Sequence, residues 1–543
     1  MNNTKAKNLN KILKISEQDN VGVALCNLMA GEIIELSGTQ IEVSQNIAIK
    51  HKIALQHFSP GDIIIMYGVP VGEVVLSIGC GDALTTENIK HRAADYKYED
   101  RTYNYNSPDI TSLQNKTFMG YHREDGQVGT ANYWLFVPLV FCQNRNLKVL
   151  KEAFETELGY KQENPYKLQL RQMLSGDSDA AASSEVINEQ VFKNIDGIKF
   201  LAHEGGCGGT RDDAQALVNL LAGYIKNPNV AGTTVLSLGC QHAQMSLLEE
   251  ALAKLNPQKP VLYFEQQQFS SEKDMLQKIV SKTYPELEKA NSIERKPAGL
   301  DKLNIGLECG GSDGFSGITA NPLIGYIADK ITAVGGRAML SEFPELCGVE
   351  QDLINRCETE EMADKFIKLM ETYNAEAKKV GSGFDMNPSP GNIKDGLITD
   401  AIKSAGAATK AGRAPISGIL DYTEYPVKSG LHLLCTPGND VESTTGLAGS
   451  GANLILFSTG LGTPTGNPVC PVIKISSNSE LPKRMMDIID FDAGKLISEE
   501  ADIENLSEDL LNLIVEIASG KTATCAQKLG QDDFIPWKRG VSL

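Results

Sequence analysis

The chain has 543 residues and a formal net charge of −18, with 41% hydrophobic and 22% charged residues. One hydrophobic core rarely organises so long a chain, so we expect two or three domains. No stretch approaches the roughly 18 apolar residues that span a bilayer, which excludes an integral membrane protein. The acidic balance disfavours binding to nucleic acid or to an anionic membrane, because both require clustered lysine and arginine.

The eleven cysteines are scattered singly along the chain. Neither a C-x-x-C pair nor a dense cysteine framework is present, so we expect reduced thiols. The first residues are polar and lack the pattern of a secretory signal. These features predict a cytoplasmic protein.

The first ninety residues predict a small all-β module. Short β-type runs such as Ile63–Met66 alternate with Gly, Asn and Pro-Gly turn signals. We place this module at residues 1–98. The polar, tyrosine-rich stretch at 99–115 contains Ser107-Pro108 and predicts a linker.

After Thr117 the pattern changes to apolar strands followed by amphipathic helices, which predicts an α/β fold with Rossmann-like strand-loop-helix units. We expect a second α/β domain at 116–285 and a C-terminal α/β domain at 296–543. A polar helical stretch, 271–296, is expected to separate them.

Four glycine-rich loops follow predicted strands, the place where α/β folds usually bind ligands. The loop at 202–213 contains His203, a candidate base or ligand, and Cys207, a candidate thiolate; the helix after it favours an anion. The loop at 237–242 contributes Cys240 and His242.

The third loop, 306–322, contains Cys309, and the fourth runs from 434 to 440 and continues at 459–464. These loops could surround a hydroxylated carboxylate.

Most other cysteines and histidines are expected to have structural roles, because a lone buried cysteine is usually a small apolar residue. We expect packing or surface positions for His91 and His432 and a turn position for Cys80, and leave Cys435 undecided. The cysteines given a packing role are Cys26, Cys142, Cys347, Cys357, Cys470 and Cys525. Of the remaining histidines, His122 and His203 are the better catalytic candidates.

Other enzyme classes have little support. The sequence has no G-x-G-x-x-G or P-loop fingerprint and no H-E-x-x-H motif. G-x-S-x-G occurs once, at 310–314, so a hydrolase with Ser312 as nucleophile stays a rival interpretation.

Four segments together resemble the altronate and galactarate dehydratase family over essentially the whole chain. They are 120–130 (GYHREDGQVGT), 203–208 (HEGGCG), 309–322 (CGGSDGFSGITANP) and 387–392 (NPSPGN). The phrases at 518–521 and 534–538, with the loop around His203, are similar to the altronate branch of that family.

The resemblance implies that the N-terminal module is a small β-clip of the SAF type. The family's SAF module commonly ends in H-x-H-N, whereas this chain has Thr85-Thr86-Glu87-Asn88. Both expected histidines are absent, with Glu87 as the one candidate to substitute. The active site is therefore expected on the α/β loops.

The resemblance also implies a hydro-lyase that converts D-altronate to 2-dehydro-3-deoxy-D-gluconate in hexuronate catabolism. The alternatives are an aldarate dehydratase acting on galactarate and a sugar-acid-binding protein without catalysis. Removing a proton beside a carboxylate favours a Lewis acid, and the family implies iron. Its form is left open between Fe²⁺ and a three-cysteine iron-sulfur cluster, with Mn²⁺ as a substitute.

Residue roles follow from this hypothesis. His203 or His122 would take the proton. The candidate metal ligands are Cys207, Cys240, Cys309 and His242. The candidate substrate contacts are Arg211, Ser312, Asp313, Thr319 and Asn321. The expected partner is a small sugar acid, with homo-oligomer formation possible.

Overall fold

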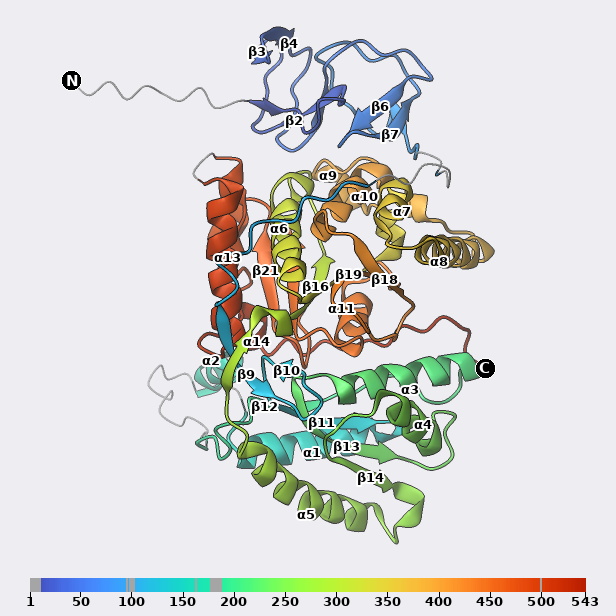
Figure 1. Cartoon of the computed structure of the whole chain (residues 1–543), viewed down its shortest axis with the longest axis vertical. Helices are drawn as coiled ribbons and strands as arrows, with labels where there is room; N and C mark the ends of the chain where they lie inside the picture. The colour runs from blue at the N-terminus through green and yellow to red at the C-terminus, as the bar shows by residue number, and fades with distance from the viewer. Residues whose placement is uncertain (1–10, 94–95, 97–102, 162–163, 176–187, 499–500) are drawn as a thin grey trace, which may run out of the picture.

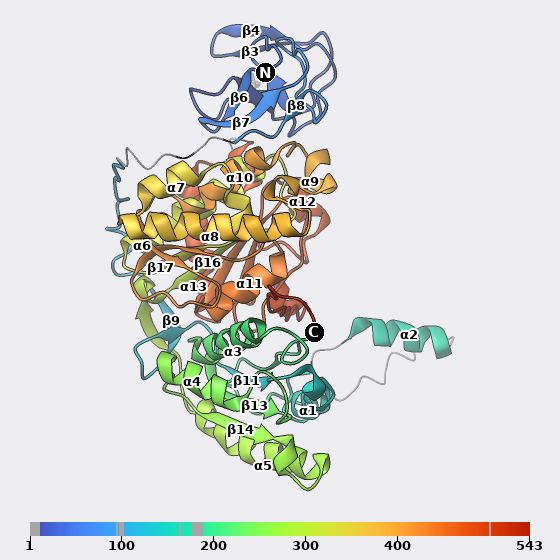
Figure 2. The ribbon, with the colours of Figure 1, turned by 90° about the vertical axis from the view of Figure 1, so that its right-hand side faces the viewer.

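The computed structural model describes residues 11–93, 96, 103–161, 164–175, 188–498 and 501–543. Three bodies follow one another along the long axis of the molecule (Figure 1). The N-terminal module lies at one end, the C-terminal domain in the middle and the second domain at the other end, as the rotated view in Figure 2 also shows. The first domain in the sequence thus lies against the last.

In its described residues the N-terminal module is built from short antiparallel strands, which confirms the predicted small β module. They form three sheets with the orders β1-β2-β5, β3-β4 and β6-β7-β8. The strands are β1 (Ile12–Leu13), β2 (Val21–Ala24), β3 (Ile33–Leu36), β4 (Thr39–Glu42), β5 (Lys52–Ala54), β6 (Ile63–Met66), β7 (Val69–Val74) and β8 (Ile89–Lys90).

The second domain is a parallel sheet with the order β12-β11-β13-β14. Its strands are β11 (Tyr133–Pro138), β12 (Gly197–Phe200), β13 (Val230–Ser237) and β14 (Val261–Glu265). The helices are α1 (Asn144–Glu157), α2 (Pro165–Ser175), α3 (Arg211–Lys226), α4 (Met245–Leu255) and α5 (Glu272–Asn291). Helices α3 and α4 cover one face of the sheet, while α1 and α5 cover the other.

The stretch at 271–296 does not separate the domains, contrary to expectation. Its helix, α5, buries Met275, Ile279 and Leu287 in the core of the second domain. The polar composition belongs to the outer face of an amphipathic helix. The expected domain end at residue 285 therefore lies inside a packed helix.

A small antiparallel sheet, β10-β9-β15, links the second and C-terminal domains. Strand β9 (Thr117–His122) leads through β10 (Val128–Gly129) into the second domain, and β15 (Lys296–Gly299) returns beside β9. The chain thus enters and leaves the second domain at one place.

The C-terminal domain is a seven-stranded parallel sheet with the order β18-β19-β17-β16-β20-β21-β22. Its strands are β16 (Asn304–Cys309), β17 (Arg337–Leu340), β18 (Ile416–Leu420), β19 (Gly430–Leu434), β20 (Leu454–Thr459), β21 (Val472–Ser476) and β22 (Phe491–Asp492). Its helices are α6 (Ala320–Ala333), α7 (Glu350–Arg356), α8 (Glu360–Lys379), α9 (Pro390–Lys394), α10 (Asp400–Ala408), α11 (Asp440–Gly449), α12 (Glu480–Arg484), α13 (Ile503–Ala518) and α14 (Cys525–Lys528). This arrangement confirms the predicted α/β class.

The longest described helices, α5 and α8, have 20 residues each and carry many charged side chains. None of the helices that the structure describes is both long and apolar enough to cross a membrane.

The N-terminal module covers the carboxyl ends of the C-terminal strands. Lys50 Nζ lies 2.8 Å from Asp313 Oδ2 in the loop after β16. The Thr399 hydroxyl donates a hydrogen bond of 2.8 Å to the Val71 carbonyl of β7. The module is therefore bonded to the loops that end the strands, where ligands of α/β proteins usually bind.

Asp313 is the centre of this junction. Its carboxylate is fully buried and accepts hydrogen bonds from the Ser477 hydroxyl at 2.7 Å and the Asn478 amide at 3.1 Å. Lys50 is its ion-pair partner from the N-terminal module. Without that ammonium group, the buried carboxylate would lose its ion-pair partner.

We predict that Lys50→Met lowers the free energy of unfolding by about 3 kcal/mol, because it leaves a buried carboxylate without its counter-charge. The matched control is Lys90→Met, since Lys90 pairs with Glu73 at the surface and such pairs contribute about 1 kcal/mol or less. Urea unfolding of both variants measures the difference. Equal losses would contradict the assigned role of the Lys50–Asp313 pair.

Candidate active site

After the neighbouring strands β16 and β20 of the C-terminal sheet, the chain continues to opposite sides. β16 leads to β17 on one side, whereas β20 leads to β21 on the other. In open α/β sheets, ligands bind beyond the carboxyl ends of the strands at such a reversal. The loops after β16, β17 and β20 are therefore the first place to look for a site.

Eight ionisable side chains gather at this edge, and we call them the carboxyl-edge cluster. They are Glu308, Cys309, Glu342, Glu345, Lys403, Lys410, Asp440 and Lys474. Six of them are buried, whereas Lys403 and Asp440 are partly exposed. A ligand would approach the cluster from the side of these two residues.

Cys309, at the end of β16, lies against two carboxylates from the chain after β17. Its thiol is 3.4 Å from Glu342 Oε2 and 3.3 Å from Glu345 Oε2. Burial, together with these two carboxylates, raises the pKa of the Cys309 thiol well above its ordinary value. The thiol therefore keeps its proton and acts as a hydrogen-bond donor towards the two carboxylates.

Two lysines neutralise these carboxylates. Lys410 Nζ lies 2.9 Å from Glu342 Oε2, and both side chains are 1% exposed. Lys403 Nζ lies 2.6 Å from Glu345 Oε1. Burial alone would lower the pKa of Lys410, but the acidic groups around it outweigh that effect and raise the pKa well above its ordinary value. The two pairs remain charged.

Glu308 has a different environment, although it is adjacent to Cys309. Its Oε2 accepts hydrogen bonds of 2.6 Å from both Ser341 and Ser443. Burial, reinforced by the charge of Glu342, raises the pKa of Glu308 well above its ordinary value. The surroundings of Glu308 therefore favour the neutral form of its carboxyl group.

Asp440 and Lys474 are the two members of the cluster whose protonation changes near neutral pH. Burial, followed by repulsion from Glu342 and Glu345, raises the pKa of Asp440 to about 7. Burial lowers the pKa of Lys474 to about 7, and its Nζ lies 3.4 Å from the centroid of the Phe457 ring. Groups with such pKa values suit proton transfer.

The local backbone brings these groups together. Glu342 has a φ of +68°, which costs a non-glycine residue about 1–3 kcal/mol and is held by a hydrogen bond of 2.8 Å from its N–H to Thr436 Oγ1. A Cβ atom on Gly310 would lie only 2.0 Å from Asp440 Oδ2. Glycine after Cys309 is therefore needed for Asp440 to reach the end of β16.

The predicted substrate contacts in the loop after β16 are buried and bonded within the fold. Asp313 is held as described above, and the Thr319 hydroxyl donates to the carbonyls of Phe315 and Ser477. Asn321 donates to the Gly406 carbonyl and accepts from Ser458. The Ser312 carbonyl accepts from Asn392, 2.7 Å away. In this structure these residues shape the loop that carries the cluster.

His203 lies elsewhere, in the second domain, beside a cavity of about 310 Å³ that residues 534–538 help to line. Its Nδ1 accepts a hydrogen bond from the Gly205 N–H, and its Nε2 lies 2.7 Å from the Pro138 carbonyl. Burial lowers the pKa of His203 to about 4. The ring is neutral with both nitrogens engaged by the main chain, so neither is available for a substrate proton in this conformation.

Other predicted residues also lie apart from the cluster. His122 is exposed on β9, with Nε2 3.0 Å from the Pro297 carbonyl. Arg211 is exposed at the start of α3. Cys207 and His242 line the cavity beside His203. The cavity and the carboxyl-edge cluster are thus separate places, and we favour the cluster because the ionisable groups are concentrated there.

The structure does not bring Cys207, Cys240 and Cys309 together. Among the described residues, two sets of at least three potential ligands have their ligand atoms within 4.8 Å of one another. One is Cys309, Glu342 and Glu345; the other is His91, Cys347 and Asp400. Cys207 and Cys240 are exposed in the second domain and belong to neither set, so a three-cysteine cluster has no geometric support.

Most of the cluster is not indicated by a sequence pattern. Glu342 and Glu345 come shortly after β17 but lie in a loop that is not rich in glycine. Lys474 is a lone charge in the otherwise apolar strand β21, which is a usable signal because buried charges are rare. Lys403 and Lys410 come from α10 and the turn after it, which no strand-end pattern indicates.

Fold and site together define a multidomain α/β enzyme suited to proton transfer. Three family descriptions cover the chain: "Altronate/galactarate dehydratase SAF domain" at residues 10–92, "D-galactarate dehydratase/Altronate hydrolase, second domain" at 120–291 and "D-galactarate/Altronate dehydratase, C-terminal" at 300–542. The N-terminal module is therefore a SAF domain.

Curated relatives match over nearly the whole chain. Altronate dehydratase of Bacillus subtilis (strain 168) is 33% identical, covering 98% of this chain and 100% of that protein. Altronate dehydratase of Escherichia coli (strain K12) is 32% identical, covering 98% and 99%. Galactarate dehydratase (L-threo-forming) of the same strain is 28% identical, covering 95% and 94%. The chain belongs to the altronate and galactarate dehydratase family and is a hydro-lyase acting on sugar acids.

We predict that Lys410→Met destabilises the protein by about 3–5 kcal/mol, because it leaves the Glu342 carboxylate buried without a counter-charge. The double variant Lys410→Met, Glu342→Gln is expected to recover most of that loss, since it removes both charges. Thermal unfolding compares the two. If the double variant is the less stable one, the ion pair does not hold the loop after β17.

Proposed function

We propose that this hydro-lyase dehydrates D-altronate to 2-dehydro-3-deoxy-D-gluconate, as a cytoplasmic enzyme of hexuronate catabolism. The carboxyl-edge cluster carries the proposal, because it joins fixed positive charge to groups that titrate near neutrality. Two relatives named altronate dehydratase, matched over nearly their full length, support the choice of substrate.

Lys403 is the proposed contact for the substrate carboxylate. It is the partly exposed lysine of the cluster, and its pairing with Glu345 holds the side chain in place. An aldonate has one carboxylate and needs one such cation, whereas galactarate has a carboxylate at each end and would need a second. This favours altronate over galactarate.

Asp440 and Lys474 are the proposed acid–base pair. The Asp440 carboxylate takes the proton from C2, and the Lys474 ammonium gives a proton to the C3 hydroxyl, which leaves as water when the C3–O bond breaks. The resulting enol becomes the 2-keto acid by gaining a proton at C3 and losing the proton of its C2 hydroxyl. The Lys410–Glu342 pair holds the loops around this reaction in position.

We also propose iron as the cofactor, with Mn²⁺ as a substitute. When bound, a divalent iron ion supplies the Lewis acidity that stabilises negative charge beside the substrate carboxylate. The described residues offer two sets of potential metal ligands: His91, Cys347 and Asp400, and Cys309, Glu342 and Glu345. In Cys309, Glu342 and Glu345 both carboxylates are already paired with lysines.

The pH profile of kcat/KM tests the acid–base pair. We expect a narrow bell near pH 7, because the Asp440 carboxylate forms as the pH rises through about 7 and the Lys474 ammonium is lost over the same range. Asp440→Asn is expected to lower kcat by about 10²–10⁴-fold and to abolish the rising limb. Glu442→Gln, on the same turn of α11, is the matched control. Full activity in Asp440→Asn would remove this residue from the mechanism.

Substrate preference is tested with iron-loaded enzyme kept under anaerobic conditions. D-Altronate and galactarate are supplied separately, and 2-keto-3-deoxy acid is measured. We expect kcat/KM to be at least tenfold higher with D-altronate, since the cluster offers one accessible cation. Turnover of galactarate alone would reject the proposed substrate, and binding of either acid without product would reject the proposed catalysis.

A further inference from the structure

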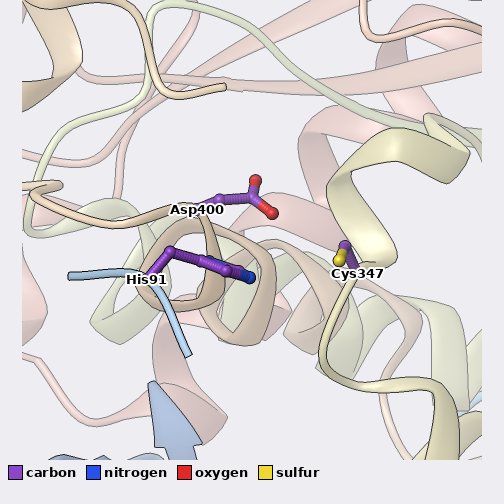
Figure 3. Close-up of side chains that lie close together, drawn as sticks. All are labelled: His91, Cys347 and Asp400. Carbon is purple, nitrogen blue, oxygen red and sulfur yellow. The ribbon is translucent and has the colours of Figure 1, made fainter. Parts of the chain in front are cut away.

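Three potential metal ligands of different chemical type lie together where the SAF domain ends. His91 follows β8, Cys347 follows the short helix η6 (Phe343–Leu346), and Asp400 is the first residue of α10. Figure 3 shows the three side chains turned towards a common space. One atom of each, an imidazole nitrogen, the sulfur and a carboxylate oxygen, lies within 4.8 Å of the other two.

We infer that His91, Cys347 and Asp400 bind a divalent first-row transition metal ion. Two ligands of one tetrahedral ion lie about 3.5 Å apart, so closing the site requires side-chain shifts of about 1 Å. Nitrogen, sulfur and oxygen donors together suit Fe²⁺ or Zn²⁺ better than Mg²⁺, Ca²⁺ or Mn²⁺, which are suited by oxygen donors.

The charges and burial of the set agree with such an ion. A thiolate, a carboxylate and a neutral imidazole balance two positive charges. Asp400 is 1% exposed, while His91 and Cys347 are partly buried, so water competes weakly for the ligands. The three protein ligands leave one position of a tetrahedral ion for an exchangeable ligand.

The other donor set is less suitable for a cation. In Cys309, Glu342 and Glu345, the two carboxylates lie 2.9 Å and 2.6 Å from lysine ammonium groups. An ion there would have to displace two buried positive charges or bind beside them. The set at His91 is therefore the better metal site.

The site connects directly to the carboxyl-edge cluster. Cys347 is two residues beyond Glu345, and Asp400 is one turn before Lys403 on α10, so two of the ligands belong to the elements that carry the Glu345–Lys403 pair. Gly348 packs against Ala93, to which an added Cβ atom would be 3.1 Å away. A bound ion would join the end of the SAF domain to both elements and thereby position Lys403.

Metal binding by the full-length protein tests this inference. The apoprotein is titrated with Co²⁺ under anaerobic conditions, and the sulfur-to-cobalt charge-transfer absorption and the bound metal are measured. We expect one ion per chain with a thiolate band. His91→Gln should lose most of the bound metal, and Cys347→Ser should lose the thiolate band. Cys207→Ser, Cys240→Ser and Cys309→Ser, which remove the other candidate sulfurs one at a time, should keep both.

An unchanged band in Cys347→Ser, full metal content in His91→Gln, or no stoichiometric ion in the wild-type protein would overturn the inference. A circular dichroism spectrum and thermal unfolding curve identify any variant that fails to fold, and His91→Asn then replaces His91→Gln. The readout does not depend on turnover. A chain that binds the ion here but does not dehydrate D-altronate would contradict the proposed substrate and leave the metal site in place.

Discussion

The buried ion pair between Lys410 and Glu342 is the constraint on which the site depends. Both side chains are 1% exposed, so neither charge could be kept at this depth without the other. Glu342 also hydrogen-bonds the Cys309 amide and occupies a left-handed backbone conformation. One pair thus fixes the end of β16 relative to the chain after β17. Asp440, Lys474 and Lys403 are arranged around that fixed point.

The SAF domain contacts the loops at the same carboxyl edge of the C-terminal sheet. Its Lys50 neutralises Asp313, and its Lys52 ammonium donates to the Gly396 carbonyl. The loop after β16 is therefore held by charges from two domains at once. These contacts attach the SAF domain to the candidate site, although Thr85 and Glu87 stand where the family has histidines. Contacts through Lys50 and Lys52 connect the module to the site.

The sequence alone predicts most of the fold but only part of the candidate site. Alternation of short β runs with turn residues, followed by strands and amphipathic helices, is local information, so the small β module and the α/β regions could be predicted. Helix α5 (272–291) was expected to separate two domains because most of its residues are polar. Its apolar face, which contains Ile279, packs into the second domain instead. Cys309 and the loop after it were placed correctly at a strand end. The residues that surround Cys309 lie far from it in the sequence: Glu342 is the nearer along the chain, whereas Lys410 and Asp440 are more than a hundred residues away.

Such partners are brought together by the order of strands in the sheet, which a single sequence does not reveal. Lys410 reaches Glu342 because the turn after α10, which contains Lys410, packs against β16 and β17. The same holds for His91, expected at a packing or surface position, and Cys347, expected to pack: their shared neighbour, Asp400, comes from a third segment. Conversely, the motif at 309–322 contains Asp313, Thr319 and Asn321, whose side chains bond within the fold and shape the loop. Ser312 contributes to the loop through its main-chain carbonyl. The motif thus indicates which loop lies at the candidate site, but it does not assign the roles of the residues in that loop.

Substrate is expected at the carboxyl-edge cluster, and a crystal structure of the Asp440→Asn variant with D-altronate tests this most directly. We expect the aldonate carboxylate beside Lys403, with C2 and C3 facing residue 440 and Lys474. Density for the sugar acid in the cavity beside His203, with the cluster empty, would contradict the account.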